Sequence, residues 1–216
     1  MKIRYTTKSK IQSRQDSIIN PAIKLFHGQL PDNLQYWTMC SYCNHKDSEL
    51  NQLLNSNLIA ENQFHGVDID QDVYNRNIEM NTSANFYRND IYQAMVNAKV
   101  SNSFKPGIIN LDTLSMGEKA SELVSKILTL VTFKNLDNKA IERKFPLIFV
   151  NTVLKAPRGN LKETVNDFPE FLFKEKDFKL CQKYTNDSWN IYSIYNYKNG
   201  NTVMQTYFLT NKEQYE

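Results

Sequence analysis

The 216-residue sequence has no long apolar run, few glycines and an odd number of cysteines. None of its apolar stretches approaches the roughly 18 to 20 residues that span a bilayer, so we expect no membrane-spanning helix. Residues 1–15 are basic and lack the apolar segment and cleavage site of a secretory signal, which makes the cytoplasm the expected location. Three cysteines without an export signal argue against a disulfide framework and for reduced thiols.

Glycine contributes only six residues, whereas Asn, Lys and Ile are abundant. This bias is typical of AT-rich coding sequences and indicates a phage, plasmid or low-GC bacterial source. Hydrophobic residues make up 41% of the chain and charged residues 23%, close to the averages for globular proteins. A chain of this length and composition buries one sizeable core, so we expect one main domain.

Positive charge gathers at the N-terminus, although the net charge is only +3. A single acid, Asp16, stands among the basic residues there, which are Lys2, Arg4, Lys8, Lys10, Arg14 and Lys24. Such an arm either binds nucleic-acid phosphates weakly or is an ordinary solvated terminus, and both interpretations stay open. We interpret residues 1–34 as this basic arm together with a helix over residues 16–27.

The body of the chain alternates short apolar or β-branched runs with longer segments whose apolar residues recur every three or four positions. This pattern predicts strands at residues 36–40, 64–69, 84–90, 108–112 and 147–151. The helices between them are expected at residues 47–59, 72–81, 91–98 and 118–131, with Asp47 or Ser48 capping the first. Repeated strand–helix units indicate a parallel sheet with right-handed crossovers.

The chain ends with a different pattern, in which aromatic or branched residues alternate with polar ones on both sides of Asn199-Gly200. That dipeptide favours a type I′ turn, so residues 188–211 are predicted to form an antiparallel hairpin. Together the patterns predict a doubly wound α/β fold. Its sheet is mostly parallel and seven-stranded, with the hairpin at the C-terminus and helices on both faces.

Acidic residues fall at the carboxyl ends of three predicted strands, at Asp68, Asp90 and Asp112. In an open parallel sheet, ligands bind beyond these ends, where the strand order reverses. A carboxylate accepts hydrogen bonds from both hydroxyls of a ribose, so Asp68 suits a nucleoside sugar, and Asp90 suits the exocyclic amine of adenine. Asp112 then borders the reactive side. Asp is also a common helix cap at such junctions, so capping is the alternative role for these acids and for Asp70.

The order of elements, the segments "HGVDID" and "NFYRND" and the final hairpin resemble the class I (Rossmann-like) methyltransferases that use S-adenosylmethionine. The resemblance spans nearly the whole chain and implies a methyltransferase-type domain over residues 35–216, acting on an unknown substrate without a metal. It implies that Asp68 binds the ribose, Asp90 the adenine side, and the loop backbone at Cys40 and Ser41 the methionine portion. By the same resemblance, Asp70 and Ile91 are further cofactor-binding residues, and Asp112 is a possible base or substrate anchor.

One feature departs from this family. Its first loop is glycine-rich so that backbone can approach the cofactor, whereas here the loop reads "MCSYCNHKDSEL" and contains no glycine. A catalytically degenerate binding or structural protein is therefore the alternative function. The segment "NLDTLS" also lacks the Pro-Pro and aromatic residue that typically follow the acidic or Asn residue in enzymes methylating base amino groups. This argues against an adenine or cytosine amino-methylase of the usual kind.

The remaining signals each have a functional and a structural interpretation. Cys40 and Cys43 form a C-x-x-C that fits a redox pair with an acidic first thiol, a zinc site with His45 and Cys181, or buried thiols, and we favour the last. His65 lies in an apolar strand and is expected to be a core residue. Aromatic side chains near the C-terminus either stack bases or pack the sheet, and packing is favoured. These are Trp189, Tyr192, Tyr195, Tyr197, Tyr207 and Phe208.

Overall fold

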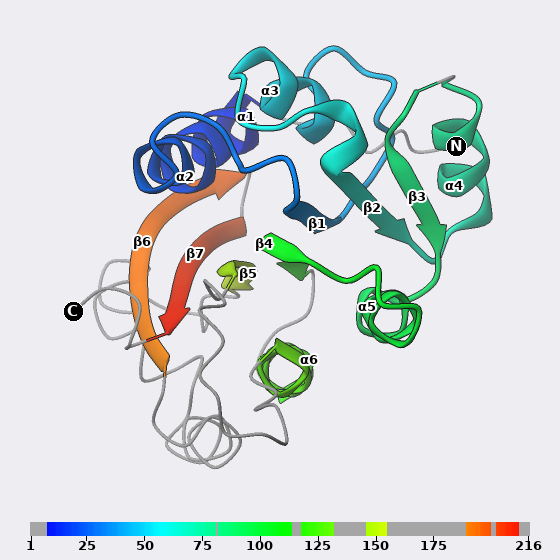
Figure 1. The fold of residues 1–216 in the computed structure, drawn as a ribbon. Coiled ribbons are helices and arrows are strands. Elements are labelled where there is room, and N and C mark those ends of the chain that lie inside the picture. The colour runs from blue at the N-terminus through cyan, green and yellow to red at the C-terminus, as the bar shows by residue number, and fades with distance from the viewer. Residues whose placement is uncertain are drawn as a thin grey trace.

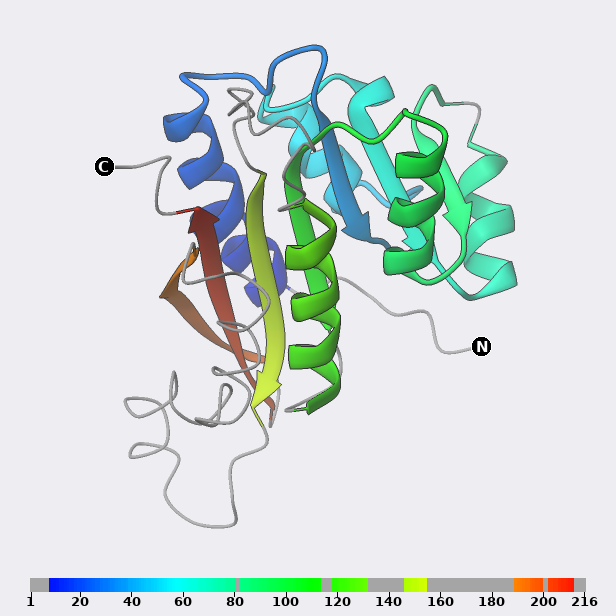
Figure 2. The same cartoon turned by 60° about the horizontal axis from the view of Figure 1, so that its bottom comes forward.

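The computed structural model describes residues 8–80, 82–113, 118–131, 146–154, 189–199 and 202–211. Its strands are β1 (Gln35–Met39), β2 (Phe64–Asp68), β3 (Asn85–Arg88), β4 (Pro106–Thr113), β5 (Leu147–Leu154), β6 (Trp189–Asn199) and β7 (Thr202–Asn211). They form one seven-stranded sheet in the order β3-β2-β1-β4-β5-β7-β6 (Figure 1). Only β7 runs against the others, because it pairs antiparallel with both β5 and β6 (Figure 2, red β7 beside yellow-green β5). The predicted fold class is confirmed.

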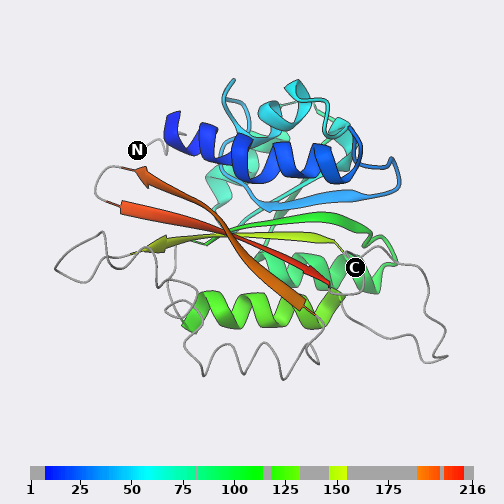
Figure 3. The same cartoon turned by 90° about the vertical axis from the view of Figure 1, so that its left-hand side faces the viewer.

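Helices cover both faces of the sheet. They are α1 (Lys8–Arg14), η1 (Gln15–Ile19), α2 (Asn20–Leu25), α3 (Glu49–Asn55), η2 (Glu61–Gln63), α4 (Gln71–Ile78), α5 (Ile91–Val100) and α6 (Glu118–Val131). The N-terminal helices and α3 pack on one face, and α5 and α6 pack on the other (Figures 1 and 3). Within the described parts of the chain, no helix has the length and apolarity to cross a membrane.

Alternating side chains of the central strands point into two separate cores. Tyr36 of β1 faces the α3 side, where Ile18 and Ile19 of the N-terminal helix are also buried. The next residue, Trp37, faces the α5 side, together with Met95 and Leu128. Strands buried on both faces read as continuous apolar runs, which explains why β4 and β5 show no inside–outside alternation in the sequence.

The N-terminal helix begins at Lys8, eight residues before the predicted start, so the prediction for residues 16–27 was wrong at that end. A π-helical turn joins α1 to α2, and the backbone N–H of Asn20 donates to the carbonyl of Gln15 there. Pro21 follows directly and has no N–H to donate, which is consistent with a local change of hydrogen-bond pattern at this point. The helix ends where His27 and Gly28 adopt positive φ of 56° and 125°.

The other elements match their predictions closely, with α3 as the main exception. Ser48 caps α3 by accepting from the backbone N–H of Asn51 at 3.2 Å, as one of the two expected caps. The helix stops at Asn55 instead of residue 59, because Asn57 takes a left-handed φ of 55°. Residues 200 and 201 lie outside the described chain, so the type I′ turn stays a prediction.

Candidate functional site

The carboxyl ends of β2, β1 and β4 lie side by side, and strand order reverses between β1 and β4. Asp68 is the last residue of β2, and the first loop, residues 40–48, leaves β1 next to it. Thr38 of β1 pairs in register with Asn110 of β4, so Cys40 and Asp112, each two residues further on, lie at the same level. The fold therefore brings Asp68, the first loop and Asp112 together at the carboxyl ends of the strands, where α/β proteins bind ligands.

The other predicted acids have clear structural roles. Asp70 is exposed and caps α4, accepting from the backbone N–H of Asp72 at 2.8 Å and of Val73 at 3.3 Å. Asp90 is also exposed and caps α5, accepting from the N–H of Gln93 at 2.9 Å. These bonds confirm the capping alternative for both residues. Both carboxylates are also exposed to solvent, so a contact with a cofactor stays a proposal.

Asp68 differs from these two because it is half-buried and caps no helix. One of its oxygens accepts from the backbone N–H of Asp70 at 2.8 Å, which closes the turn between β2 and α4. This bond orients the carboxylate at the end of the strand. Ile91, the first residue of α5, is buried in the core on the α5 side.

The first loop takes a path that does not require glycine. Positive φ angles among the described non-glycine residues occur only at His27, Asn57 and Asn102, none of which lies in residues 40–48. The side chains of Cys40 and Cys43 belong to the α3-side core and are only 4% and 1% exposed. Gly66 on β2 makes the room, since a Cβ there would lie 2.6 Å from the sulfur of Cys40. The glycine that this arrangement needs is therefore in the neighbouring strand.

The two thiols have the environment of buried structural cysteines, as favoured from the sequence. A hydrogen bond with the Cys43 thiol, together with burial, raises the pKa of Cys40 well above its usual value. This direction argues against an acidic first thiol and favours the interpretation as buried thiols. Cys181 lies outside the described residues, and among those described no group of three or more His, Cys, Asp or Glu side chains is arranged to hold a metal ion.

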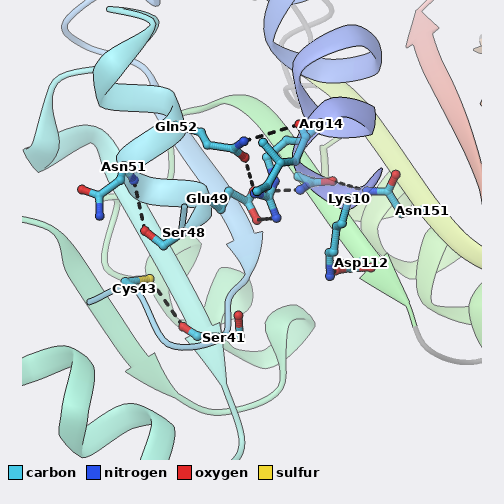
Figure 4. Close-up of polar contacts among 12 residues, drawn as sticks. Lys10, Arg14, Ser41, Cys43, Ser48, Glu49, Asn51, Gln52, Asp112 and Asn151 are labelled. Carbon is cyan, nitrogen blue, oxygen red and sulfur yellow. Dashed lines mark hydrogen bonds and ion pairs between the residues drawn. The ribbon is translucent and has the colours of Figure 1, made fainter. Parts of the chain in front are cut away.

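Asp112 pairs with a cation from the segment that the sequence analysis interpreted as a basic arm. Lys10, from the first turn of α1, forms an ion pair with Oδ2 of Asp112 (Figure 4). The other oxygen, Oδ1, is buried and has no hydrogen-bond partner; among the described side chains, only the hydroxyl of Thr38 shares that condition. An unpaired buried acceptor is costly unless something donates to it, so Oδ1 is a natural contact for a bound ligand.

Arg14 also points inward from the N-terminal helix. Its guanidinium donates to the amide oxygen of Gln52 and lies 3.6 Å from a carboxylate oxygen of Glu49 (Figure 4). Arg14 and Glu49 are each only 7% exposed. Both cations pair with acids of the same chain, which favours a structural role for Lys10 and Arg14 over contact with nucleic-acid phosphates.

Glu49 begins a chain of buried polar groups that crosses the sheet beneath the first loop. Its Oε1 accepts from the hydroxyl of Tyr36 at 2.6 Å and from the amide of Asn110 at 2.8 Å. Asn110 in turn accepts from Asn151 at 2.8 Å, and Asn151 accepts from Thr206 at 2.6 Å. Burial and the nearby Glu49 raise the pKa of Tyr36, which stays a neutral donor. The network links β1, α3, β4, β5 and β7.

Sequence reasoning missed this network, although part of it carried a signal. Asn110 and Asn151 are single amides near the ends of apolar runs, "IINLD" and "LIFVN", and a buried amide needs partners. Glu49, by contrast, looks like an ordinary acid in the first turn of a helix. Its partners come from elements distant in the sequence.

His65 and the described aromatic residues are core components, as predicted. His65 stacks on Trp37, with ring centroids 4.6 Å apart, and its Nδ1 lies 2.9 Å from the hydroxyl of Tyr87. Tyr207 is buried, and Phe208 stacks on Phe149 at 5.1 Å. The side chains of Trp189, Tyr192, Tyr195 and Tyr197 lie outside the described ones.

A cavity of about 540 Å³ lies along the outer strand β3, between α4 and α5. Tyr87 and Arg88 of β3, Tyr74 of α4 and Asn97 of α5 contribute to its lining. None of the predicted site residues lines it. The candidate site rests on the strand ends and not on this cavity.

No family model and no curated protein sequence matches this chain. Among solved structures, it is similar to the magnesium protoporphyrin IX methyltransferase (ChlM) of Synechocystis PCC 6803. With the SAM-bound form the TM-score is 0.55 at 12% identity, covering 98% of this chain and 86% of that one. With the SAH-bound form it is 0.53 at 13% identity, covering 97% and 90%. The likeness extends over nearly the whole of both chains, so the two proteins share a fold.

Proposed function

We propose that this chain, which has the fold of the class I methyltransferases, binds S-adenosylmethionine and transfers its methyl group to an acceptor. The observation that carries the proposal is the half-buried carboxylate of Asp68. It ends β2 next to the first loop, beside the point where the strand order β3-β2-β1-β4-β5-β7-β6 reverses.

The residues present fit this cofactor in chemical terms. Asp68 would accept from the ribose hydroxyls, with Asp70 nearby, and Asp90 and Ile91 would border the adenine. The loop backbone at Cys40 and Ser41 would contact the methionine portion, since the buried thiol of Cys40 points away from that side. When bound, the cofactor supplies an activated methyl group on a sulfonium, and the acidic residues around it suit its positive charge.

Asp112 is proposed to act on the acceptor substrate. Its Oδ1 is an unpaired buried acceptor, while Lys10 holds Oδ2. This geometry suits a substrate that donates an N–H or O–H, which Asp112 would orient or deprotonate as the methyl group arrives. The substrate itself stays unknown, and the sequence after β4 argues against a base amino group.

The alternative is a degenerate member of this fold that binds no cofactor. The glycine-free first loop favours it, because side chains replace the small residues that let backbone approach a ligand. Both the cofactor and its demethylated product, S-adenosylhomocysteine, should bind if the proposal is right.

Calorimetric titration with the two compounds decides between these functions. At about 100 times the dissociation constant, binding should stabilise the fold by about 2.7 kcal/mol and raise the melting temperature by roughly 5 to 10 °C. Adenosine serves as a control for recognition of the nucleoside alone. If neither compound gives heat or a shift in melting temperature, the degenerate alternative is correct.

Two further parts of the proposal concern partners and location. We assign any weak, non-specific contact with nucleic acid to the basic residues at the start of the chain, Lys2, Arg4 and Lys8, because Lys10 and Arg14 are paired internally and Lys24 lies near the end of the helix. A cytoplasmic location is supported by the free, buried thiols of Cys40 and Cys43, which suit a reducing compartment.

A further inference from the structure

One side chain of α4 holds the first loop in place. Asn77 is only 1% exposed and faces the loop from the last turn of the helix. Its Oδ1 accepts from the backbone N–H of Cys43 at 2.8 Å. Its Nδ2 donates to the carbonyl of Ser41 at 3.0 Å and lies 3.7 Å from the sulfur of Cys40. A single carboxamide thus satisfies one donor and one acceptor of the loop backbone.

This contact matters because the loop belongs to no helix or strand. Backbone polar groups that are buried need partners, and a loop has no regular ladder to supply them. In a glycine-rich loop, unusual φ angles set the path of the chain, but residues 40–48 contain none with positive φ. The path is therefore set by side chains, and Asn77 makes three of the polar contacts.

Other contacts also hold the first loop in this position. The thiol of Cys40 lies against Gly66, and the buried thiol of Cys43 donates to the carbonyl of Ser41 at 3.5 Å (Figure 4). Arg76, the residue before Asn77, places its guanidinium 5.2 Å from the ring centroid of Tyr42. Two successive residues of α4 thus hold the loop, and Ser41 is left exposed at its surface.

Helix α4 also connects the two ends of the proposed cofactor site. Asp70, two residues after the proposed ribose-binding Asp68, caps its N-terminus, and Asn77 lies in its last turn. We propose that Asn77 is a positioning residue, which fixes the backbone of Ser41 and Cys43 for the methionine portion of S-adenosylmethionine. The role rests on the proposed function and explains how a loop without glycine can serve the cofactor.

The first test replaces Asn77 with Leu, which has a similar size and no hydrogen-bonding group. Asn77→Leu should weaken binding of S-adenosylhomocysteine about tenfold or more by calorimetry, since two buried hydrogen bonds that shape the loop are lost. In the free protein, the Cys43 amide should exchange its hydrogen faster by NMR. Asn75→Leu is the matched control, because the side chain of Asn75 is exposed on the same helix and accepts from the side chain of Gln71, within the helix. It should leave both measurements unchanged.

A second variant, Asn77→Asp, separates positioning from general stability. Its carboxylate still accepts from Cys43, but as an anion it repels the Ser41 carbonyl, which raises the pKa of the new carboxyl. When protonated, it donates again. Binding relative to the unmodified protein should therefore be weak at pH 8 and recover toward pH 5. The two proteins differ at this one side chain, so the ratio of their affinities at each pH reports the new carboxyl.

The outcomes distinguish this inference from the proposed function. Weakened binding by Asn77→Leu, faster exchange at Cys43 and recovery of Asn77→Asp at low pH support the positioning role. If the unmodified protein binds and Asn77→Leu binds within about threefold of it, the role is overturned while the proposed function stands. If the unmodified protein does not bind, both are overturned.

Discussion

At the residue scale, His65 shows how burial keeps a titratable group neutral. Its ring lies on Trp37 in the α5-side core and contacts the hydroxyl of Tyr87. Burial lowers the pKa of His65 to about 4. In the unfolded chain the pKa is about 6.5, so as pH falls the unfolded state binds a proton first. The stability associated with neutral His65 is therefore present above pH 6.5 and is lost as pH falls toward 4.

This difference predicts a specific pH dependence. Between pH 7.5 and pH 5, His65 should lower the free energy of unfolding by about 2 kcal/mol. His65→Phe keeps an aromatic ring in the stack and cannot titrate, so it should lose about 2 kcal/mol less than the unmodified protein over this range. Urea unfolding at both pH values measures the difference. The exposed His45→Gln is the control and should behave as the unmodified protein does. Equal losses for all three proteins would contradict the prediction.

Asp68 is the residue on which the cofactor proposal depends most. Asp68→Ala should weaken binding of S-adenosylmethionine by about 1.5 to 3 kcal/mol, since a charged hydrogen-bonding partner is lost. This corresponds to roughly 10- to 150-fold in the dissociation constant measured by calorimetry. Asp72→Ala removes an exposed acid in the first turn of α4 and serves as the control. A dissociation constant within about threefold of the unmodified protein would remove Asp68 from the site.

At the scale of elements, the N-terminal helix is an integral part of the fold. Its apolar residues Ile18, Ile19 and Ala22 join the α3-side core, and its polar residues enter the site. Lys10 reaches Asp112 on β4, and Arg14 reaches Glu49 on α3 (Figure 4). The helix thus combines hydrophobic docking with two ion pairs at the carboxyl ends of the strands.

The Arg14–Glu49 pair predicts a coupling between this helix and α3. Arg14→Met leaves a buried carboxylate without its cation and should cost about 3 kcal/mol in the free energy of unfolding. Glu49→Gln in the same chain should recover much of that loss, because a neutral amide still accepts from Tyr36 and Asn110. Urea unfolding measures both variants, with the exposed Lys24→Met as the control. If Arg14→Met matches Lys24→Met, the pair does not hold the helix.

At the scale of the whole molecule, the internal pairing of cations lowers the charge available to an external partner. The chain has a net charge of +3, and two of its N-terminal cations are committed to Asp112 and Glu49. Electrostatic binding to nucleic acid depends on cations that can reach phosphates. Apart from Lys24 near the end of the helix, the remaining basic residues of the arm are Lys2, Arg4 and Lys8.

Three phosphate contacts predict a shallow salt dependence. The logarithm of the binding constant should fall with the logarithm of salt concentration with a slope of about −2.7 on duplex DNA and about −2.1 on single strands. Deleting residues 1–7 should remove most of it, while Lys10, Arg14 and the helix stay in place. Fluorescence anisotropy with labelled oligonucleotides measures the slope. If the deletion leaves the slope unchanged, the arm does not bind nucleic acid and any binding surface lies elsewhere on the protein.

The sequence by itself determined the layout of the sheet and the position of its acids. Apolar residues that recur every two positions indicate a strand, and those that recur every three or four indicate a helix, with one buried face. This spacing depends only on the local sequence. For that reason the strands, helix α6 and the terminal hairpin were predictable, and Asp68 and Asp112 fell at strand ends. The Ser48 cap was predictable for the same reason, since a cap bonds only its own first turn.

The tertiary structure alone decided how those residues are used. Lys10, Arg14 and Asn77 lie on helix faces whose polarity looks like solvent exposure, yet each contacts a group far along the chain or on another element. Their burial depends on which elements become neighbours, and local spacing does not encode that. The same holds for the first loop, whose missing glycine is offset by Gly66 in the adjacent strand. A contact between strands exists only once the sheet has formed.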